Sequence, residues 1–482
     1  MNVLVIGVDQ MRFDTPGCLG MPNHAETPAL DALARRGTLF ENAYTTCPLC
    51  SPARASIFTG QHAFHHRMCT NCDMYQPVTY DLERPQELLH NAFLRRGYDC
   101  LYEGKWHVCT HAGPVDLGFQ GMNSRNYGNF SSSPDFLDYL EKNGYSRRIS
   151  DPVYYNNWNQ TLGAGVWDGP EESTPEYYLA QRTIDALTAQ AKTGRPFFMT
   201  CQFWGPHGPH LPPRSYVGRN DRSRIVPWEN MDDDLRGKAA IIRRELDFYA
   251  CAPETWPQWR EIIGLYLDFS SFIDSQIGRI LSALDDLGLR DDTLVFFESD
   301  HGDMTGAHGG SIDKGFLYEE AMHVPMIAAG PGIRSGVRTK ELVYNMDILP
   351  TAMDMLDMPI PETVDARSLK ALLSGGQYTG RDQIYLEFHG LRFLYSQRGL
   401  ITADGMKYIL SAGDFDEVYD LNADPWELHN VIEDPAYAGR VADLKKRMMD
   451  QAAAVRDPLA NYICKIFGQW NHPAVSNWLP TV

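Results

Sequence analysis

The chain has 482 residues, of which 43% are hydrophobic and 22% charged, and its formal net charge is −19. This length and composition predict a globular protein with a large core, built as two to three domains or as one large α/β domain with an appendage. The acidic balance argues against nucleic acid as a partner, because proteins that bind nucleic acid usually present a basic face.

The chain begins with an apolar run at Val3–Val8, which is too short for the hydrophobic region of a signal peptide and has no cleavage site after it. We interpret this run as the first core strand and expect a protein that stays in the cytoplasm. No stretch of the sequence is long and apolar enough to span a bilayer, so a membrane partner is not expected. Ten cysteines in such a chain indicate reduced thiols rather than a disulfide framework.

Strands and helices alternate through most of the chain. One helix has clear ends, with Thr27 as its predicted N-cap, Pro28 as its first residue and Gly37 as its stop. The predicted strands are residues 3–8, 38–44, 98–103, 196–203 and 293–297, and the predicted helices are residues 28–36, 86–96, 174–190 and 259–287. The short apolar strands are of the buried parallel type. This alternation predicts an α/β fold with a large, mostly parallel sheet flanked by helices.

Two regions depart from this pattern. Residues 121–172 are rich in Gly, Asn, Ser and Tyr, which predicts long loops or a lid. After about residue 375 the strands become shorter, as at residues 407–410 and 417–421. We therefore predict a catalytic α/β domain over residues 1–375 and a smaller C-terminal α+β subdomain over residues 376–482.

Polar residues follow four of the predicted strands. The four groups are Asp9-Gln10, Gly104–His107, Pro206-His207 and Ser299–Asp303. Because ligands of such folds bind at the carboxyl ends of the strands, we expect these groups to form one site.

The most informative stretch runs from Cys50 to Gly60 and contains Pro52, Arg54 and Thr59. It resembles the signature of the sulfatase family, Cys-x-Pro-x-Arg followed by a short helix and Thr-Gly. In that family the cysteine is oxidised to formylglycine, and a hydroxyl of the hydrated aldehyde attacks sulfur. The resemblance therefore implies that Cys50 is the precursor of the nucleophile and that a formylglycine-generating maturation enzyme is a partner. The chemistry is physically sound, because a hydroxyl on a metal ion ionises readily and a helix N-terminus directs N–H groups toward an anion.

Two other interpretations of Cys50 explain less of the sequence. A cysteine phosphatase would need Cys-x5-Arg, whereas the spacing here is Cys-x3-Arg. A structural zinc site could use the pairs Cys47/Cys50 and Cys69/Cys72. It would leave Arg54 and the polar strand ends without a role.

The resemblance continues along most of the chain and implies an alkaline phosphatase-like fold. The other matching blocks are Asp9–Asp14, Gly104–His107, Gly205–Pro209, Asp300–Asp303, Gly306–Gly309, Lys314–Glu319, Val324-Pro325, Asp347–Thr351 and Tyr419–Asn430. Their order is that of the family, so chance is a poor explanation.

The resemblance also implies one divalent metal ion held by Asp9, Asp300, His301 and the oxygens of modified Cys50. Carboxylates and an imidazole suit a hard or borderline cation. The Asp-Gln and Asp-His pairs resemble choline sulfatases and phosphonate monoester hydrolases, which leaves calcium, manganese and magnesium open. Gln10 is expected to contact the substrate or the metal shell.

Five residues supply the local positive charge that the acidic total lacks: Arg54, Lys105, His107, His207 and Lys314. We expect Arg54 to hold the formylglycine diol and a sulfate oxygen, and Lys105 and Lys314 to bind sulfate oxygens. His207, together with Lys314, is the candidate acid for the leaving oxygen. His107 is the candidate base that regenerates the aldehyde.

Other polar residues have weaker signals. Asn71 falls where choline sulfatases and phosphonate hydrolases place a substrate-contacting Asn, but a turn between Cys69 and Cys72 explains it equally well. His210 repeats the Pro-His dipeptide, yet the Gly-Pro-His-x-Pro frame favours His207. We interpret His62, His65, His66 and His210 as structural and leave His308 unassigned.

We therefore predict a sulfuric ester hydrolase that cleaves a small-molecule sulfate monoester of aryl, alkyl or choline type. A phosphonate monoester or phosphodiester hydrolase is the alternative, although such relatives tend to lose the Lys and His that Gly104–His107 retains. A non-catalytic binding protein with unmodified Cys50 disagrees with the intact blocks. Trp158, Trp167 and Trp204 could line an aryl pocket, but core packing is the commoner fate of tryptophan.

We expect a homodimer or homotetramer, because relatives of the choline and phosphonate kind assemble through C-terminal extensions. The tail from Arg456 carries Phe467, Trp470 and Trp478. It could dock on a second subunit or pack on its own domain.

Overall fold

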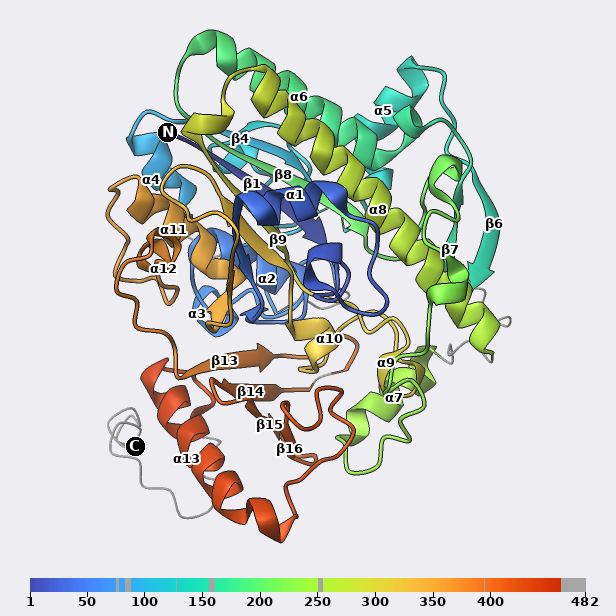
Figure 1. Cartoon of the computed structure of the whole chain (residues 1–482), viewed down its shortest axis with the longest axis vertical. Helices are drawn as coiled ribbons and strands as arrows, with labels where there is room; N and C mark the ends of the chain where they lie inside the picture. Colours follow the sequence, from blue (N-terminus) through green and yellow to red (C-terminus); the bar gives the residue numbers. More distant parts are fainter. Residues whose placement is uncertain are drawn as a thin grey trace.

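The computed structural model describes residues 1–74, 78–82, 88–126, 128–155, 161–249, 255–393 and 395–460 (Figure 1). Within these residues the main sheet has the strand order β11-β2-β10-β9-β1-β8-β4-β5. The strands are β1 (Asn2–Asp9), β2 (Gly37–Phe40), β4 (Asp99–Gly104), β5 (Gln120–Gly121), β8 (Phe197–Pro206), β9 (Thr293–Ser299), β10 (Met326–Ala329) and β11 (Val337–Thr339). β1 is parallel to β8 and β9, and β8 is parallel to β4, whereas β10 is antiparallel to β9 and β2. The predicted large, mostly parallel sheet is confirmed.

The two faces of this sheet carry separate apolar cores, because successive side chains of a strand point to opposite faces. Leu4, Ile6 and Val8 of β1 pack in the first core, and Val3 and Val5 pack in the second. Every residue of β1 is buried, as expected of a parallel strand that is covered on both faces.

Helices cover both faces. The first core includes residues of α1 (Pro28–Arg36), α6 (Pro175–Thr193) and α8 (Trp256–Asp286); the second includes residues of α2 (Cys50–Thr59), α4 (His90–Arg95), α11 (Ile348–Met355) and α12 (Lys370–Ser374). The two long helices α6 and α8 run beside each other (Figure 1). The shorter helices α3 (Ala63–His66), α5 (Pro134–Lys142), α7 (Ala240–Tyr249), α9 (Ala307–Gly310) and α10 (Glu319–Met322) complete the set discussed below. None of the helices in the described residues combines the length and apolarity needed to cross a membrane.

A smaller antiparallel sheet follows near the C-terminus, and α13 (Ala438–Ala454) packs against it (Figure 1). Its strands pair in chain order: β13 (Gln383–Phe388), β14 (Gln397–Thr402), β15 (Met406–Ser411) and β16 (Glu417–Asp420). Ile384 and Leu386 of β13 share an apolar core with Tyr44 and Leu317. The small sheet therefore packs directly against segments of the larger α/β part of the chain. The domain boundary at residue 375 stays a prediction.

Residues 121–172 differ from the predicted loops or lid. The region contains α5 and an antiparallel pair, β6 (Ile149–Tyr154) with β7 (Leu162–Trp167). α5 forms because Phe136 and Leu140 lie four residues apart on one face and are buried together. The Gly- and Asn-rich composition around them hid this pattern.

The predicted strand 38–44 is also divided in two. β2 stays in the main sheet, whereas β3 (Ala43–Tyr44) leaves it to pair with β12 (Val343–Tyr344). The predicted helix 86–96 is seen as α4, and residues 83–87 before it lie outside the described residues. Trp158, Phe467, Trp470 and Trp478 also lie outside them.

Candidate active site

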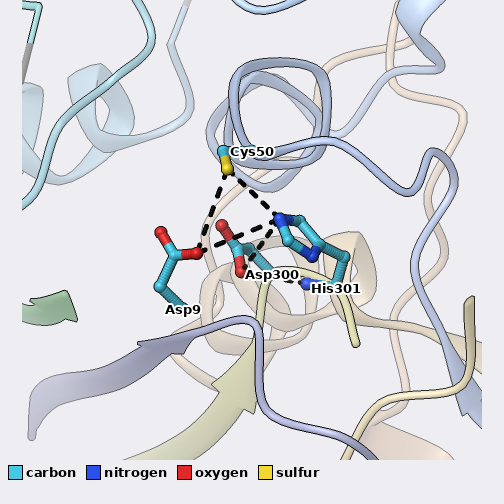
Figure 2. A group of neighbouring side chains, drawn as sticks. All are labelled: Asp9, Cys50, Asp300 and His301. Atoms are coloured by element: carbon cyan, nitrogen blue, oxygen red, sulfur yellow. Dashed lines mark hydrogen bonds and ion pairs between the residues drawn. The ribbon is translucent and has the colours of Figure 1, made fainter. Parts of the chain in front are cut away.

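The polar strand ends meet at one edge of the main sheet. Asp9 is the last residue of β1, and Asp300 and His301 directly follow β9. The parallel register pairs Val8 with Ser299, which places the residues after them side by side. Cys50 begins α2, and Figure 2 shows it facing the other three side chains.

Asp9, Cys50, Asp300 and His301 form a buried group that could hold a metal ion, with one ligand atom from each within 4.8 Å of the others. Nε2 of His301 lies 3.2 Å from Sγ of Cys50 and 3.8 Å from Oδ1 of Asp300 (Figure 2). Nδ1 of His301 is 2.9 Å from the carbonyl oxygen of Gly302, which can only accept, so Nδ1 carries the proton. The carboxylates of Asp9 and Asp300 and an unprotonated Nε2 of His301 then suit a divalent cation.

Electrostatics support this fit. Burial lowers the pKa of His301, but Asp300 and Cys50 outweigh it and raise the pKa to about 9. Without a cation, Nε2 would therefore hold a proton at neutral pH. A divalent cation can take the place of that proton and neutralise the same anionic groups.

Arg54 compensates the buried carboxylates. Its Nη2 is 3.0 Å from Oδ2 of Asp9 and its Nε is 2.9 Å from Oδ2 of Asp300. Burial and Cys50 raise the pKa of Asp9, but Lys105 and Arg54 outweigh them and lower it to about 2. The guanidinium thus helps to keep Asp9 ionised and holds both carboxylates in place. Its expected contact with a sulfate oxygen stays a prediction.

Position 50 favours negative charge. Nζ of Lys105 contacts the Asp9 carboxylate and lies 3.8 Å from Sγ of Cys50. Burial raises the pKa of the Cys50 thiol, but Lys105, Lys314 and His301 outweigh it and hold the pKa well below its usual range. The first turn of α2 adds N–H groups directed at the same place.

Lys314 joins the candidate acid to Gln10. Its Nζ is 2.8 Å from Nε2 of His207 and 2.7 Å from Oε1 of Gln10. Nδ1 of His207 is 2.7 Å from the carbonyl oxygen of Gly208, so Nε2 accepts from Lys314. Burial lowers the pKa of Lys314, but Asp313 at 3.1 Å and other anions raise it above its ordinary range. Lys314 therefore directs its positive charge at Nε2 of His207.

The histidines interpreted as structural make other contacts. His210 packs edge-on against Tyr266 at 5.1 Å, whereas His207 is the histidine that meets Lys314. His66 hydrogen-bonds Ser56 at 3.1 Å. His62 and His65 lie 3.3 Å from Glu387 and 2.7 Å from Asp365, respectively.

His308, left unassigned from the sequence, belongs to a buried ion-pair network. Its Nδ1 is 3.0 Å from Asp233 and its Nε2 is 3.4 Å from Glu320. His308, Glu320 and Glu427 are close enough to form a second group of possible metal ligands. The ammonium of Lys407, 2.8 Å from Glu427, already provides a cation there, so we interpret the group as ion pairs.

The structure does not support the zinc alternative. Within the described residues, the groups that could hold a metal include Cys50 but not Cys47, Cys69 or Cys72. Sγ of Cys69 instead lies 3.6 Å from the carbonyl oxygen of Ala63.

Two of the tryptophans considered for an aryl pocket pack in the first core. Trp167 and Trp204 are both buried there. Trp204 also stacks on His207, with ring centroids 6.2 Å apart, and so supports the candidate acid.

Sequence reasoning missed several contacts of the site. Asp73 lies 2.9 Å from Nε2 of His107, and Gln202 accepts from Nη1 of Arg54 at 3.1 Å. Gln202 had a signal, because it is a polar residue within the apolar run of β8. Asp73 had none beyond its place two residues after Asn71. Asn71 itself accepts the backbone N–H of Ser51 at 3.0 Å, and its expected contact with substrate stays a prediction.

Comparison with known proteins decides the family. The profile of the sulfatase family matches residues 1–358. The chain belongs to the sulfatase family. A second profile, described as N-sulphoglucosamine sulphohydrolase, C-terminal, matches residues 306–454 of this sulfatase, which include the small antiparallel sheet.

Several relatives match over nearly the whole chain. An arylsulfatase of Clostridium perfringens is 31% identical and covers 93% of this sulfatase and 94% of its own length. A choline-sulfatase of Rhizobium meliloti is 29% identical, over 90% and 83% of the two chains. The crystal structure of a phosphonate monoester hydrolase of Agrobacterium radiobacter superposes with a TM-score of 0.79 at 26% identity, over 94% and 96% of the chains. The predicted family, alkaline phosphatase-like fold and sulfatase activity are confirmed.

Proposed function

We propose that this sulfatase cleaves small-molecule sulfate monoesters through a formylglycine made from Cys50, with one divalent cation held by Asp9, Asp300, His301 and residue 50. The observation that carries this proposal is that these four side chains lie together, with the ammonium groups of Lys105 and Lys314 near Cys50. Sγ of Cys50 stands where an oxygen of formylglycine would lie. A maturation enzyme must then modify Cys50 before or during folding, because the residue is buried.

When bound, the cation would lower the pKa of a hydroxyl on residue 50 and so allow a nucleophile near neutral pH. Arg54 helps to keep Asp9 ionised and fixes both Asp9 and Asp300 in position. Lys105 approaches residue 50 from the side of Asp9. Its charge opposes the repulsion between the anionic substrate and the acidic protein, and it stabilises charge that develops on the sulfate oxygens.

Lys314 and His207 are suited to the leaving group. Their Nζ and Nε2 atoms lie 2.8 Å apart, and Gln10 and Asp313 hold Lys314 in place. This pair can deliver a proton to the departing oxygen as the S–O bond breaks. Burial lowers the pKa of His107, but Asp73 and Cys50 raise it, so His107 lies close to residue 50 and is placed to take a proton there when sulfate is released.

A phosphonate monoester or phosphodiester hydrolase is the second candidate. It is favoured by the phosphonate monoester hydrolase structure described above and by a 27% identical relative from Trinickia caryophylli named a multifunctional alkaline phosphatase superfamily protein. Both reactions displace an alcohol from a tetrahedral anionic centre. Lys105 and His107 within the site favour sulfate, because they lie at residue 50 and suit the release of a sulfated intermediate.

A substrate panel tests the proposal. Protein made with a formylglycine-generating enzyme is assayed on matched aryl sulfate, aryl phosphonate and bis-aryl phosphate esters, beside the Cys50→Ala variant. The proposal predicts the highest kcat/KM on the sulfate and loss of all three activities in Cys50→Ala. A higher kcat/KM on the phosphonate would establish the second candidate, and full activity of Cys50→Ala would contradict the nucleophile. Choline sulfate and alkyl sulfates then extend the panel to the organic half of the substrate.

A further inference from the structure

A carboxylate with no assigned role lies directly behind the candidate base. Oδ1 of Asp73 is 2.9 Å from Nε2 of His107. The imidazole is 3% exposed, whereas the Asp73 side chain is 37% exposed. Burial lowers the pKa of His107, but Asp73 and Cys50 raise it, so the imidazole lies close to both of these groups.

The turn that carries Asp73 is fixed to the nucleophile. The backbone N–H of Cys72 donates to Oγ of Ser51 at 3.1 Å, and that same Oγ donates to the carbonyl oxygen of His107. The hydroxyl of Thr110 donates to the carbonyl oxygen of Cys72 at 2.8 Å. Ser51 therefore ties three segments together: the start of α2, the Asp73 turn and the backbone of His107.

The backbone at His107 is also constrained. Its φ is +50°, a left-handed conformation that residues with a side chain rarely adopt. Such a conformation persists only where surrounding contacts determine it, and it is found most often at functional sites. Here the Ser51 hydroxyl holds the carbonyl and Asp73 meets the ring, so both ends of His107 are fixed.

The pair joins a buried imidazole to a carboxylate that is more than a third exposed, so water offsets part of what their contact adds to folding stability. A histidine that takes a proton through one ring nitrogen, by contrast, works better when a carboxylate at the other nitrogen fixes its orientation and tautomer. With Nε2 in contact with Asp73, Nδ1 is the nitrogen left to serve residue 50.

We propose that Asp73 is a positioning residue that orients His107 for proton transfer at residue 50. The carboxylate accepts the Nε2–H, which leaves Nδ1 unprotonated and ready to take a proton, and it then faces the imidazolium that results. No proton moves to Asp73 itself. This inference rests on the proposed role of His107 as the base.

The test compares two Asp–His pairs of the same region. Asp81 lies 2.6 Å from Nδ1 of His111, but that imidazole is 73% exposed, whereas His107 is buried. The variants are Asp73→Asn, Asp73→Glu and, as the matched control, Asp81→Asn. Each is prepared as the matured enzyme, its formylglycine content is measured by mass spectrometry, and kcat and KM are measured on an aryl sulfate.

We expect Asp73→Asn to lower kcat about 10- to 100-fold, the usual effect of removing a carboxylate that orients a functional histidine, with KM within about twofold. Asp73→Glu, which keeps the carboxylate, should recover part of the loss. Asp81→Asn should match the wild type. In a His107→Asn background, a further Asp73→Asn change should have no effect on the residual rate, because Asp73 acts through His107.

Two outcomes would overturn the inference. One is a wild-type kcat in Asp73→Asn. The other is a loss that persists unchanged in the His107→Asn background or accompanies reduced formylglycine content, since either would indicate a structural role. Failure of the proposed function would look different, because the wild type itself would lack formylglycine or sulfatase activity.

Discussion

Replacing Arg54 with methionine removes the guanidinium that lies between the buried carboxylates of Asp9 and Asp300. Both carboxylates are fully buried, and each loses a charge-assisted contact of 3.0 Å or 2.9 Å. Removing one partner of a buried ion pair costs about 3–5 kcal/mol, because the other charge stays buried without that partner. Lys105 still contacts Asp9, so the cost falls mainly on Asp300. We expect Arg54→Met to lose about that much unfolding free energy when no divalent cation is present.

The assay is urea unfolding with a chelator and again with excess calcium or manganese. Because a bound cation neutralises the same two carboxylates, the deficit of Arg54→Met should shrink when the cation is present. Arg214→Met is the control, since Arg214 forms an exposed pair with Asp151 and its loss should leave the unfolding midpoint unchanged. An Arg54→Met midpoint equal to that of the control, with or without cation, would refute the reasoning.

Three further predictions concern the site and the core. Lys314→Ala should lower kcat/KM about 10²- to 10³-fold, as loss of a transition-state charge partner does. The control Lys446→Ala, at an exposed lysine of α13, should leave kcat/KM unchanged. A loss below about tenfold in Lys314→Ala would contradict the assignment of Lys314. A cation at a hundred times its Kd stabilises the folded state by about 2.7 kcal/mol. Chelation should remove this stabilisation and lower the melting temperature reversibly, and an unchanged melting temperature would contradict the metal site. Burial raises the pKa of Glu176 to about 8, so the folded state keeps a proton that the unfolded state loses above pH 4.5. Wild-type stability should then fall as pH rises from 4.5 toward 8, by up to about 1.4 kcal/mol per pH unit, and Glu176→Gln should remove this contribution; parallel curves for the two proteins would contradict it.

The elements that could be predicted are those with strong local signals. β1 is a continuous apolar run, and α1 has an N-terminal proline and a C-terminal glycine. The division between β2 and β3 could not be seen, because it depends on the pairing of β3 with β12, which is far along the chain. α5 was hidden by the polar composition around its two buried side chains.

The same distinction holds for the site. Asp9, Cys50, Asp300 and His301 stand in recognisable motifs, and the structure brings them together. The contacts between side chains carry no such signal. Arg54 stands in the same motif as Cys50 and was expected to hold the formylglycine diol and a sulfate oxygen, and the structure also joins it to two carboxylates. Asp73 is the plainest example, because only the folding of its turn against Ser51 places it behind His107.

The most direct test of the formylglycine mechanism is the mass of one tryptic peptide. Residues 37–54 form a peptide with both Cys47 and Cys50, so the first cysteine is an internal control for thiol alkylation. In protein made with a formylglycine-generating enzyme, we predict a single alkylated cysteine at position 47 and, at position 50, an aldehyde whose oxygen has replaced sulfur with loss of two hydrogens. Alkylation of both cysteines in that material would contradict the mechanism.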